Sequence, residues 1–223
     1  MNYLVVVAHP DDEVLGAGAT IHKLIQEGHR VAVAIMVGKA GARANLSASL
    51  SEDEAKAMKI LGVDKVYQAD FPNIEMNVTS HLSLVQFVES CIKDWQADAL
   101  ITHHSSDTNI DHHETAKAVN AACRLFQRTD GVPRLKELLC MEVPSSTEWS
   151  LDSADNRFVP NMFVEIGEEG LRVKLEALEA YQGVMRKYPH PRSKEAIEGL
   201  AAYRGAQSGR TYAEAFECVF RCM

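Results

Sequence analysis

The stretch that decides the fold spans residues 3–37 and reads YLVVVAHPDDEVLGAGATIHKLIQEGHRVAVAIMV. Tyr3–Ala8 and Arg30–Val37 are continuous apolar runs rich in β-branched residues, which is typical of strands buried on both faces of a parallel sheet. Between them, Ala17–Glu27 has apolar residues at helical spacing and is followed by a glycine. The stretch therefore predicts a strand, a helix and a second strand, which is the βαβ unit.

The same alternation continues along the chain. Short strands are expected at Lys65–Gln68 and Ala99–Thr102, and Ser51 with Glu54 has the spacing of a capping box at a helix start. Further helices are expected at Ser80–Trp95, Asp111–Phe126, Glu168–Arg186 and Ser193–Tyr203, and strands at Leu138–Val143 and Asn161–Ile166. The pattern predicts an α/β fold with a mostly parallel sheet in a single domain, residues 1–223. The core is expected in about residues 1–145, with residues 146–223 completing the pocket.

The composition excludes several classes of protein. The chain has 223 residues, a formal net charge of −8 and 46% hydrophobic residues, which is ordinary for a globular protein and unlike a disordered one. No apolar run approaches the roughly 18 residues of a membrane span, so no membrane partner is expected. The acidic balance argues against nucleic acid as a partner. Five scattered cysteines without a CxxC pair indicate reduced thiols and a cytoplasmic location.

Two polar loops, both rich in histidine and aspartate, follow predicted strands. His9–Glu13 (HPDDE) follows the first strand, and His103–His113 (HHSSDTNIDHH) follows the strand at Ala99–Thr102. Ligands of open α/β sheets bind beyond the carboxyl ends of the strands, so we expect the two loops to converge. Imidazole and carboxylate groups are normal Zn²⁺ ligands, and a catalytic zinc has three protein ligands. His9 and Asp12 would supply two of them, and a histidine of the second loop would supply the third.

Each loop also has a simpler interpretation. HPDDE is an acidic turn that would favour the N-terminus of the following helix through the helix dipole. Each histidine of the second loop, taken singly, would be an ordinary hydrogen-bonded surface group. Four histidines within 11 residues, at the functional edge of the sheet, favour the metal site.

The residues around these loops carry a resemblance to a known family. Ala8–Gly16 reads AHPDDEVLG, which is similar to the A-H-P-D-D-E-x-x-G signature of the PIG-L/LmbE family of zinc-dependent N-acetylglucosamine deacetylases. Asn109–His112 reads NIDH and resembles the family's second motif, H-x-D-H, with asparagine in place of the first histidine. The tail, Gly205–Arg210 and Ala213–Phe216, also resembles the family, so the similarity spans most of the chain. The resemblance implies a Rossmann-like, three-layer fold.

The resemblance also implies a function and a set of site residues. It implies one Zn²⁺ per chain, held by His9, Asp12 and His112, and removal of an acetyl group from an N-acetylglucosamine-type sugar or its conjugate. Asp11 would be the general base that takes a proton from a metal-bound water, since bound zinc lowers the pKa of that water to about 7. The nucleophile formed in this way would attack the acetamide carbonyl.

Four further residues receive supporting roles from the resemblance. Family members often place a histidine near the developing oxyanion; here Asn109 would donate through its amide, or His104 would fill the space. Asp111 would orient a metal-bound histidine, because such histidines usually donate their other N–H to a carboxylate or a carbonyl. Glu13 is expected to support the site rather than to bind the metal.

Two more distant residues have two interpretations each. Arg43, in a loop rich in glycine and alanine, would contact sugar hydroxyls or a phosphate of the substrate, or it is an ordinary surface arginine. His190, flanked by Pro189 and Pro191, would reach the site from the C-terminal region, or it belongs to a structural turn.

The expected partner is a small amino-sugar substrate, and the resemblance also suggests a homo-oligomer. Two alternatives to the deacetylase stay open. Asp111, His112 and His113 spell the DHH motif of a family of metal-dependent phosphoesterases, although the N-terminal D-x-D of that family is absent. The second alternative is a non-catalytic sugar- or nucleotide-binding pseudo-enzyme, because of Asn109.

Overall fold

The computed structural model of the protein describes residues 1–37, 50–151 and 156–223. In chain order the strands and helices are β1 (Asn2–Val7), α1 (Asp12–Gln26), β2 (Arg30–Ile35), α2 (Leu50–Leu61), β3 (Lys65–Gln68), α3 (His81–Trp95), β4 (Ala99–His103), α4 (Ile110–Ala122), β5 (Glu137–Met141), β6 (Met162–Glu165), α5 (Gly167–Ala180), α6 (Lys194–Ser208) and β7 (Ala213–Arg221). Short 3₁₀ helices lie at Met76–Val78, Leu125–Gln127 and Thr147–Trp149. Each helix in these described ranges is too short or too polar to cross a membrane.

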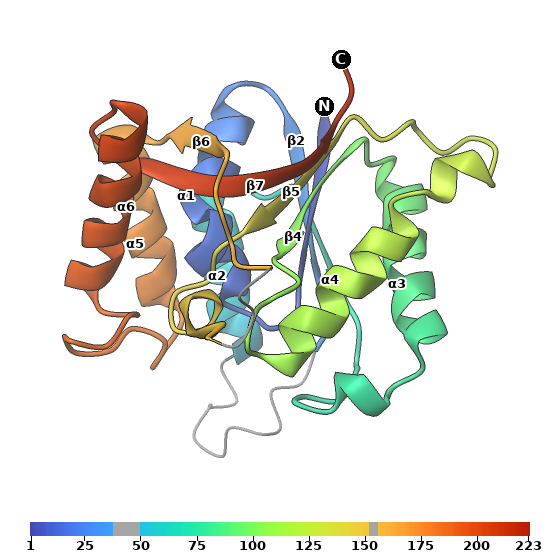
Figure 1. Cartoon of the computed structure of the whole chain (residues 1–223), viewed down its shortest axis with the longest axis horizontal. Helices are drawn as coiled ribbons and strands as arrows, with labels where there is room; N and C mark the ends of the chain where they lie inside the picture. Colours follow the sequence, from blue (N-terminus) through green and yellow to red (C-terminus); the bar gives the residue numbers. More distant parts are fainter. Residues whose placement is uncertain (38–49, 152–155) are drawn as a thin grey trace.

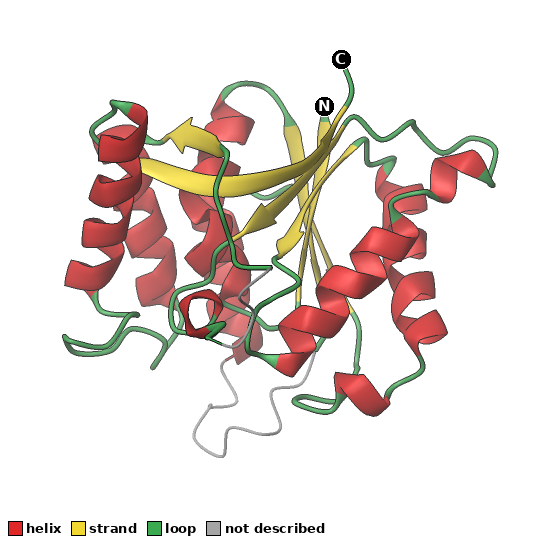
Figure 2. Ribbon diagram, in the orientation of Figure 1, coloured by secondary structure: helices red, strands yellow, loops and turns green. Residues whose placement is uncertain are grey.

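A single sheet runs through the described residues, between two layers of helices (Figure 1; Figure 2). Its strand order is β3-β2-β1-β4-β5-β7-β6. The strands from β3 to β5 in that order are parallel, and β7 pairs antiparallel with both β5 and β6. The α/β class, the mostly parallel sheet and the three-layer architecture expected from the sequence are confirmed.

Alternating side chains of β1 connect the two helix layers to the sheet. Tyr3, Val5 and Val7 point into a core shared with α1, α2, α5 and α6, whereas Leu4 and Val6 point into a second core shared with α3 and α4. Successive side chains of a strand face opposite sides of its sheet, so a strand buried on both faces needs apolar residues throughout. The run YLVVV meets this requirement, and Figure 1 shows α3 and α4 on one side of the sheet with α1, α2, α5 and α6 opposite.

Several element boundaries differ from the sequence prediction. Helix α2 already includes Leu50, so Ser51 lies inside its first turn and the capping-box prediction is wrong; Glu54 instead accepts a hydrogen bond from Gln68 Nε2 at 2.8 Å. Helices α4 and α5 end earlier than expected, because the chain turns after each of them into segments without regular helix. The long strand β7 is not among the predicted elements, yet it joins β6 to the rest of the sheet.

Helix α1 packs closely against β5 at its start. A Cβ atom added to Gly16 would lie 2.4 Å from Sδ of Met141, so a larger residue requires that side chain to move. The glycine in the sequence AHPDDEVLG therefore allows the first turn of α1 to approach the sheet, which places Asp12 and its neighbours at the end of β1.

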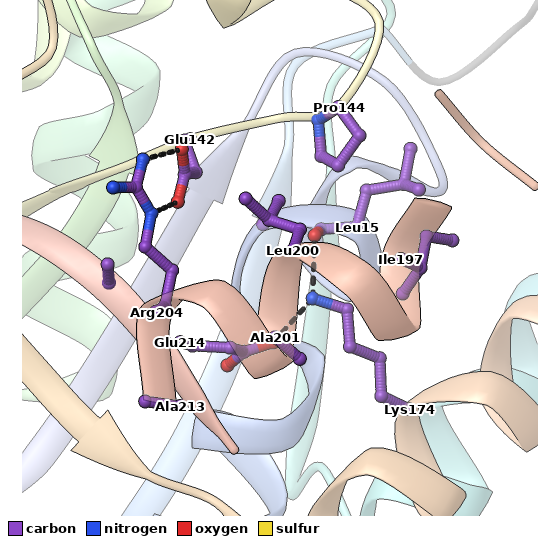
Figure 3. Close-up of a pocket in the computed structure, with 12 residues that line it drawn as sticks. Leu15, Glu142, Pro144, Lys174, Ile197, Leu200, Ala201, Arg204, Ala213 and Glu214 are labelled. Carbon is purple, nitrogen blue, oxygen red and sulfur yellow. Dashed lines mark hydrogen bonds and ion pairs between the residues drawn. The ribbon is translucent and has the colours of Figure 1, made fainter. Parts of the chain in front are cut away.

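A buried ion pair joins α1 to the C-terminal third of the chain (Figure 3). Lys174 Nζ, from α5, lies 2.6 Å from Glu214 Oε1 of β7 and donates to the carbonyl of Leu15 at 2.8 Å. Glu214 accepts hydrogen bonds from the backbone N–H groups of Ala19 and Thr20, at 3.2 and 2.7 Å. In a regular helix the N–H of residue 19 donates to the carbonyl of residue 15. Here each of these two backbone groups also contacts one member of the ion pair: the N–H of Ala19 contacts Glu214, and the carbonyl of Leu15 contacts Lys174. The pair fixes α1 relative to β7 and α5.

Candidate metal centre

The two polar loops meet where β1 and β4 end. β1 and β4 are neighbours in the sheet. The chain adds β2 and β3 on the β1 side of this pair, and it adds β5 on the β4 side. Such a reversal opens a crevice beyond the carboxyl ends of the strands, where α/β proteins bind their ligands. The backbone N–H of Ala8 donates to His103 Nε2 at 2.9 Å and so connects the end of β1 to the end of β4.

Three side chains from these loops converge on one point. His112 Nε2 lies 3.1 Å from Asp12 Oδ2, and His9 Nδ1 lies 3.3 Å from the same oxygen. The two ring nitrogens are 3.3 Å apart. Asp12 and His112 are buried, and His9 is partly buried. The fold therefore brings together the three residues that the sequence predicts as metal ligands.

Two further carboxylates lie behind the histidines of this cluster. His9 Nε2 is 3.0 Å from Asp111 Oδ2, and His112 Nδ1 is 3.0 Å from Asp107 Oδ2. A histidine that binds a metal through one nitrogen usually donates its other N–H to a carboxylate or carbonyl, which fixes the tautomer and the ring orientation. The cluster has two such pairs, His9 with Asp111 and His112 with Asp107.

Asp111 is itself held in place by backbone groups. It accepts hydrogen bonds from the N–H of Ile74 at 2.6 Å and of Met76 at 3.1 Å. Burial alone would raise the pKa of the Asp111 carboxyl, but the hydrogen bonds from His9 and from these two N–H groups lower it. Asp111 is thus an anion that orients His9, in the place where the sequence predicts an orienting carboxylate.

Asp107 is a site residue that the sequence analysis missed. It accepts hydrogen bonds from Thr147 Oγ1 at 2.8 Å, from Ser146 Oγ, and from the N–H of Asn109 at 2.9 Å. In the sequence Asp107 is one of several small polar residues of the loop, and no local signal singles it out, because its partners Ser146 and Thr147 lie about 40 residues further along the chain.

One oxygen of the cluster has no partner among the described residues. Asp12 Oδ1 is buried and makes no hydrogen bond within residues 1–37, 50–151 and 156–223. A buried carboxylate oxygen without a partner is costly, and a cation would satisfy it. Two imidazole nitrogens and one carboxylate, with a fourth position for water, form a ligand set of catalytic zinc. The residues present therefore fit a Zn²⁺ ion.

The charges of the cluster also favour a cation. Burial opposes a positive charge on His112, but Asp12 and Asp107 outweigh it and raise its pKa to about 10. Burial likewise opposes protonation of His9, yet hydrogen bonds with Asp111 and Asp12 raise its pKa to about 9. Burial alone would raise the pKa of Asp12, but the neighbouring histidines hold it well below its usual range. The carboxylates thus attract positive charge, supplied by protons or by a metal.

A second group of ligand atoms shares His112 with the first. His103, Asp107 and His112 also place ligand atoms within 4.8 Å of one another. This group suits a metal less well, because His103 Nε2 already accepts the N–H of Ala8 and Asp107 already accepts the Thr147 hydroxyl. Burial lowers the pKa of His103 to about 3, so its ring is neutral, and it stacks on His112 with the ring centroids 3.9 Å apart.

Asp11 stands at the start of α1, beside the cluster. Its φ of 105° is uncommon for an aspartate and is the kind of backbone strain found at functional sites. Its backbone N–H donates to Glu13 Oε2 at 3.1 Å, and its Oδ2 lies 3.1 Å from Arg192 Nη1. Glu13 also accepts the hydroxyl of Tyr181 at 2.8 Å. Burial raises the pKa of Glu13 to about 8, so this residue supports the turn as a largely neutral group near pH 7.

The sequence matches the family described as PIG-L: GlcNAc-PI de-N-acetylase over residues 4–123, which is more than half of the chain. The chain belongs to the PIG-L family. It is accordingly a hydrolase of the deacetylase type, and PIG-L deacetylases depend on a metal ion.

Relatives of this PIG-L chain include both curated proteins and solved structures. YaiS of Escherichia coli (strain K12), an uncharacterized deacetylase, is 28% identical over 185 residues, which covers 80% of this chain and 89% of YaiS. N,N'-diacetylchitobiose deacetylase from Pyrococcus horikoshii has a TM-score of 0.78 at 19% identity, covering 98% of this chain and 83% of that one. GalB, the 4-carboxy-2-hydroxymuconate hydratase of Pseudomonas putida KT2440, has a TM-score of 0.80 at 21% identity, covering 100% and 97%. The solved structures show the fold, which by itself does not select between deacetylation and hydration.

The two residues predicted near the oxyanion lie in different surroundings in this PIG-L chain. Asn109 caps α4, with its side-chain oxygen accepting the N–H of Asp111 at 2.9 Å. His104 Nδ1 is 2.7 Å from Ser106 Oγ, and its Nε2 is 3.3 Å from Glu217 Oε2 on β7. His104 belongs to neither group of ligand atoms that the described residues form, whereas Asn109 stands next to both orienting carboxylates.

Only one of the two predicted substrate contacts of the PIG-L chain, His190, lies among the described residues, and it is not brought to the cluster. His190 is exposed, and its Nδ1 accepts the backbone N–H of Arg192 at 3.0 Å. The residue of this segment that reaches Asp11 is Arg192, which the sequence analysis did not single out. Arg43 lies outside the described residues.

Proposed function

We propose that the chain is a zinc-dependent hydrolase that removes the N-acetyl group from an N-acetylglucosamine-type amino sugar or a conjugate of one. The observation that carries the proposal is the convergence of His9, Asp12 and His112, whose ligand atoms lie within 4.8 Å of one another, with Asp11 directly before Asp12 at the start of α1. Membership of the PIG-L family supports deacetylation as the reaction.

The chain's residues divide into a ligand set and its supports. His9, Asp12 and His112 would hold the ion, while Asp111 and Asp107 keep the two imidazole rings in the orientation that binding needs. Zinc supplies Lewis acidity, which lowers the pKa of water and polarises a carbonyl.

Asp11 is the residue that moves the proton. Its carboxylate takes a proton from the water that attacks the acetamide carbonyl, and the conjugate acid returns a proton to the leaving amine. Asn109, whose side-chain oxygen caps α4, would donate its amide N–H to the developing oxyanion. Glu13 keeps the Asp11 turn in its left-handed conformation by accepting the backbone N–H of Asp11.

The amino-sugar class rests on what the relatives share. The family description refers to GlcNAc-PI, and the Pyrococcus horikoshii relative acts on N,N'-diacetylchitobiose. Both compounds carry an acetamido group on a glucosamine ring, so we take this acetamido sugar as the part that the site recognises.

Acetate release tests the proposal directly. We expect protein stripped with a chelator to regain activity on zinc addition, measured on N-acetylglucosamine, N,N'-diacetylchitobiose and a nucleotide-linked N-acetylglucosamine. Purified protein should carry about one zinc per chain. Asp11→Asn should keep that zinc and lose about 10²–10⁴ in kcat, because a general base is removed. Asp130→Asn, at an exposed aspartate, is the matched control and should leave kcat unchanged.

The alternatives give different results in the same experiment. Zinc-loaded protein that releases no acetate from any of these sugars contradicts deacetylation of amino sugars. Nucleotide release from a short oligonucleotide would favour the phosphoesterase, although His113 Nδ1 contacts the carbonyl of Ser105 and so does not join His112 in one ligand group. Gently purified protein without metal would favour the pseudo-enzyme.

We also infer a cytoplasmic location. All five cysteines are free thiols, and Cys91 and Cys140 are buried in the cores, as expected for a chain that folds in a reducing compartment. A homo-oligomer stays a prediction, and light scattering of the purified protein tests it.

A further inference from the structure

Arg192 reaches the proposed base from a segment far away in the sequence. It lies just before α6, and its contact with Asp11 spans 181 residues of chain. Nη1 of Arg192 lies 3.1 Å from Asp11 Oδ2, and its Nε donates to Ser145 Oγ at 2.7 Å. Arg192 is 9% exposed and Asp11 is 3% exposed, so this ion pair is shielded from solvent.

The backbone around Arg192 is held as firmly as its side chain. Its N–H donates to His190 Nδ1 at 3.0 Å, and its carbonyl accepts the N–H of Arg186 at 3.1 Å. The next residue, Ser193, caps α6 by accepting the N–H of Ala196 at 3.1 Å. The hydrogen-bonded backbone fixes the position from which the side chain extends, and the planar guanidinium loses less side-chain entropy per hydrogen bond than a lysine would.

The contact with Arg192 restrains the orientation of the Asp11 carboxylate, which the backbone of Asp11 does not fix. The left-handed φ of 105° and the hydrogen bond to Glu13 fix the main chain of Asp11. The direction of its carboxylate then depends on the side-chain torsions of Asp11, and Arg192 donates a hydrogen bond to one of the two carboxylate oxygens. Arg192 also supplies positive charge to a turn that carries the acidic residues Asp11, Asp12 and Glu13 in succession.

We propose that Arg192 is a positioning residue that holds the Asp11 carboxylate in the orientation in which Asp11 takes the proton from water. This inference rests on the proposed function, since it assumes that Asp11 is the base. Misplacing a reacting group by about 1 Å costs on the order of 10²-fold in rate. Lysine would keep the charge but not the fork that contacts Asp11 and Ser145 together.

Another arginine of the same region provides a matched control. Arg204, on α6, pairs with Glu142 through two hydrogen bonds of 2.7 and 2.6 Å (Figure 3). Its side chain is 13% exposed, so its burial is similar to that of Arg192. Because Arg204 contacts neither Asp11 nor the metal ligands among the described residues, its loss should change stability and not the chemical step.

Steady-state kinetics of zinc-loaded variants test the positioning role. We expect Arg192→Ala to lower kcat for acetate release about 10²-fold with KM changed by less than about twofold. Arg192→Lys should recover part of the loss, and Arg204→Ala should remain near wild type. Zinc content should stay at about one per chain in all variants. In the Asp11→Asn background, adding Arg192→Ala should cost nothing further, because both changes disable one step.

Three kinetic results would overturn the inference. The first is a kcat for Arg192→Ala equal to that of Arg204→Ala. The second is a rise in KM at unchanged kcat, which would assign Arg192 to substrate binding. The third is a double variant whose loss is the product of the two single losses, which would make Arg192 independent of Asp11.

Thermal unfolding gives a readout that needs no activity. Arg192→Ala removes the ion pair between Arg192 and the buried Asp11 carboxylate and should lower Tm, and adding Asp11→Asn should restore part of that loss. Strictly additive shifts in Tm would show that the two residues are uncoupled and would overturn the inference. Wild-type protein that releases no acetate would refute the proposed function instead, while the unfolding cycle still judges the contact.

Discussion

Two buried groups of charged residues lie along α1, and they are balanced in different ways. Lys174 and Glu214 carry one charge of each sign, 2.6 Å apart, and both also bond to the backbone of α1. At the start of the helix, Asp12 shares its site with two further carboxylates and two histidines, whose charge depends on what they bind.

The difference separates a structural ion pair from a binding site. The Lys174–Glu214 pair is complete within the protein, because its charges and hydrogen bonds satisfy each other. The cluster around Asp12 retains a buried oxygen without a partner among the described residues and attracts positive charge to its histidines. Buried charge that the chain does not balance by itself indicates a site for a cation, whereas balanced charge indicates a link between elements.

Removing a proposed ligand should have the largest effect on this contrast. His112→Ala deletes one nitrogen of the cluster, so we expect zinc content to fall from about one per chain to near zero, with loss of acetate release. Metal analysis after gel filtration measures this. His113→Ala, one position along α4 and outside the cluster, is the control and should keep its zinc. Full zinc content in His112→Ala would contradict His112 as the third ligand and would assign that role to another histidine.

Breaking the balanced pair should change stability instead of metal content. Lys174→Met leaves Glu214 buried and unpaired, which we expect to lower the free energy of unfolding by about 3–5 kcal/mol. Denaturant unfolding measures it, and zinc content below the transition should be unchanged. Adding Glu214→Gln should return part of the stability. Loss of zinc in the folded Lys174→Met protein would show that the two groups are coupled through α1.

The pH should affect the cluster but not the Lys174 pair. With pKa values raised to about 9 for His9 and about 10 for His112, both rings are protonated at pH 7 in metal-free protein. Zinc must displace both protons, so its apparent affinity should rise about 100-fold per pH unit up to pH 9. Chelator competition between pH 6 and 8 measures it. A pH-independent affinity would contradict the protonated cluster.

The same two pKa values have the opposite consequence for the stability of metal-free protein. A histidine whose pKa is raised on folding contributes stability that is fully present below the unfolded value of about 6.5. That contribution should be lost as the pH rises through the folded values of about 9 and 10. Thermal unfolding of chelated protein as a function of pH tests this, and a Tm that rises over this range would contradict it.

Removing an orienting carboxylate should weaken metal binding without abolishing it. Asp107→Asn keeps the size of the side chain but removes the anion behind His112. We expect zinc affinity to fall about 10–100-fold, as for other partners of metal-bound histidines. Competition with a chromogenic chelator gives the affinity, with Asp130→Asn as the exposed control. An unchanged zinc affinity would mean that the negative charge of Asp107 does not contribute to metal binding through His112.

The smallest effect is expected at Glu13. Its pKa of about 8 means that it is mostly neutral at pH 7, so Gln can accept from the N–H of Asp11 and donate to the hydroxyl of Tyr181. We expect Glu13→Gln to change the free energy of unfolding by less than about 1 kcal/mol, and Glu13→Ala by about 1–3 kcal/mol. Equal losses in the two variants would show that Glu13 acts as an anion.

The positions of the ligand loops could be predicted because each follows a strand made mainly of apolar residues. Parallel strands end at one edge of the sheet, so the loops after Val7 and His103 had to meet if β1 and β4 were neighbours. The choice of His112 among four histidines depended on the family motif, since its neighbour His113 has the same chemistry and differs only in the face of α4 from which it projects.

Arg192 and Asp107 could not be predicted in the same way. The contact of Arg192 depends on the path by which the chain returns from α5 to the loop at Ser145, and no local pattern encodes that path. Asp107 sits among other small polar residues, and its partners Ser146 and Thr147 come from a loop about 40 residues further along the chain. Both contacts join segments that only the folded sheet brings together.

The separation of the ligands along the chain has a consequence for folding. His9 and His112 are 103 residues apart. An ion bound by both would close a loop of that length, as a covalent cross-link does, and would reduce the conformational entropy of the unfolded chain. That loop contains α1 to α3 with β2 to β4, whereas β1, α5, α6 and β7 lie outside it. Metal binding would therefore also stabilise the first half of the chain against unfolding.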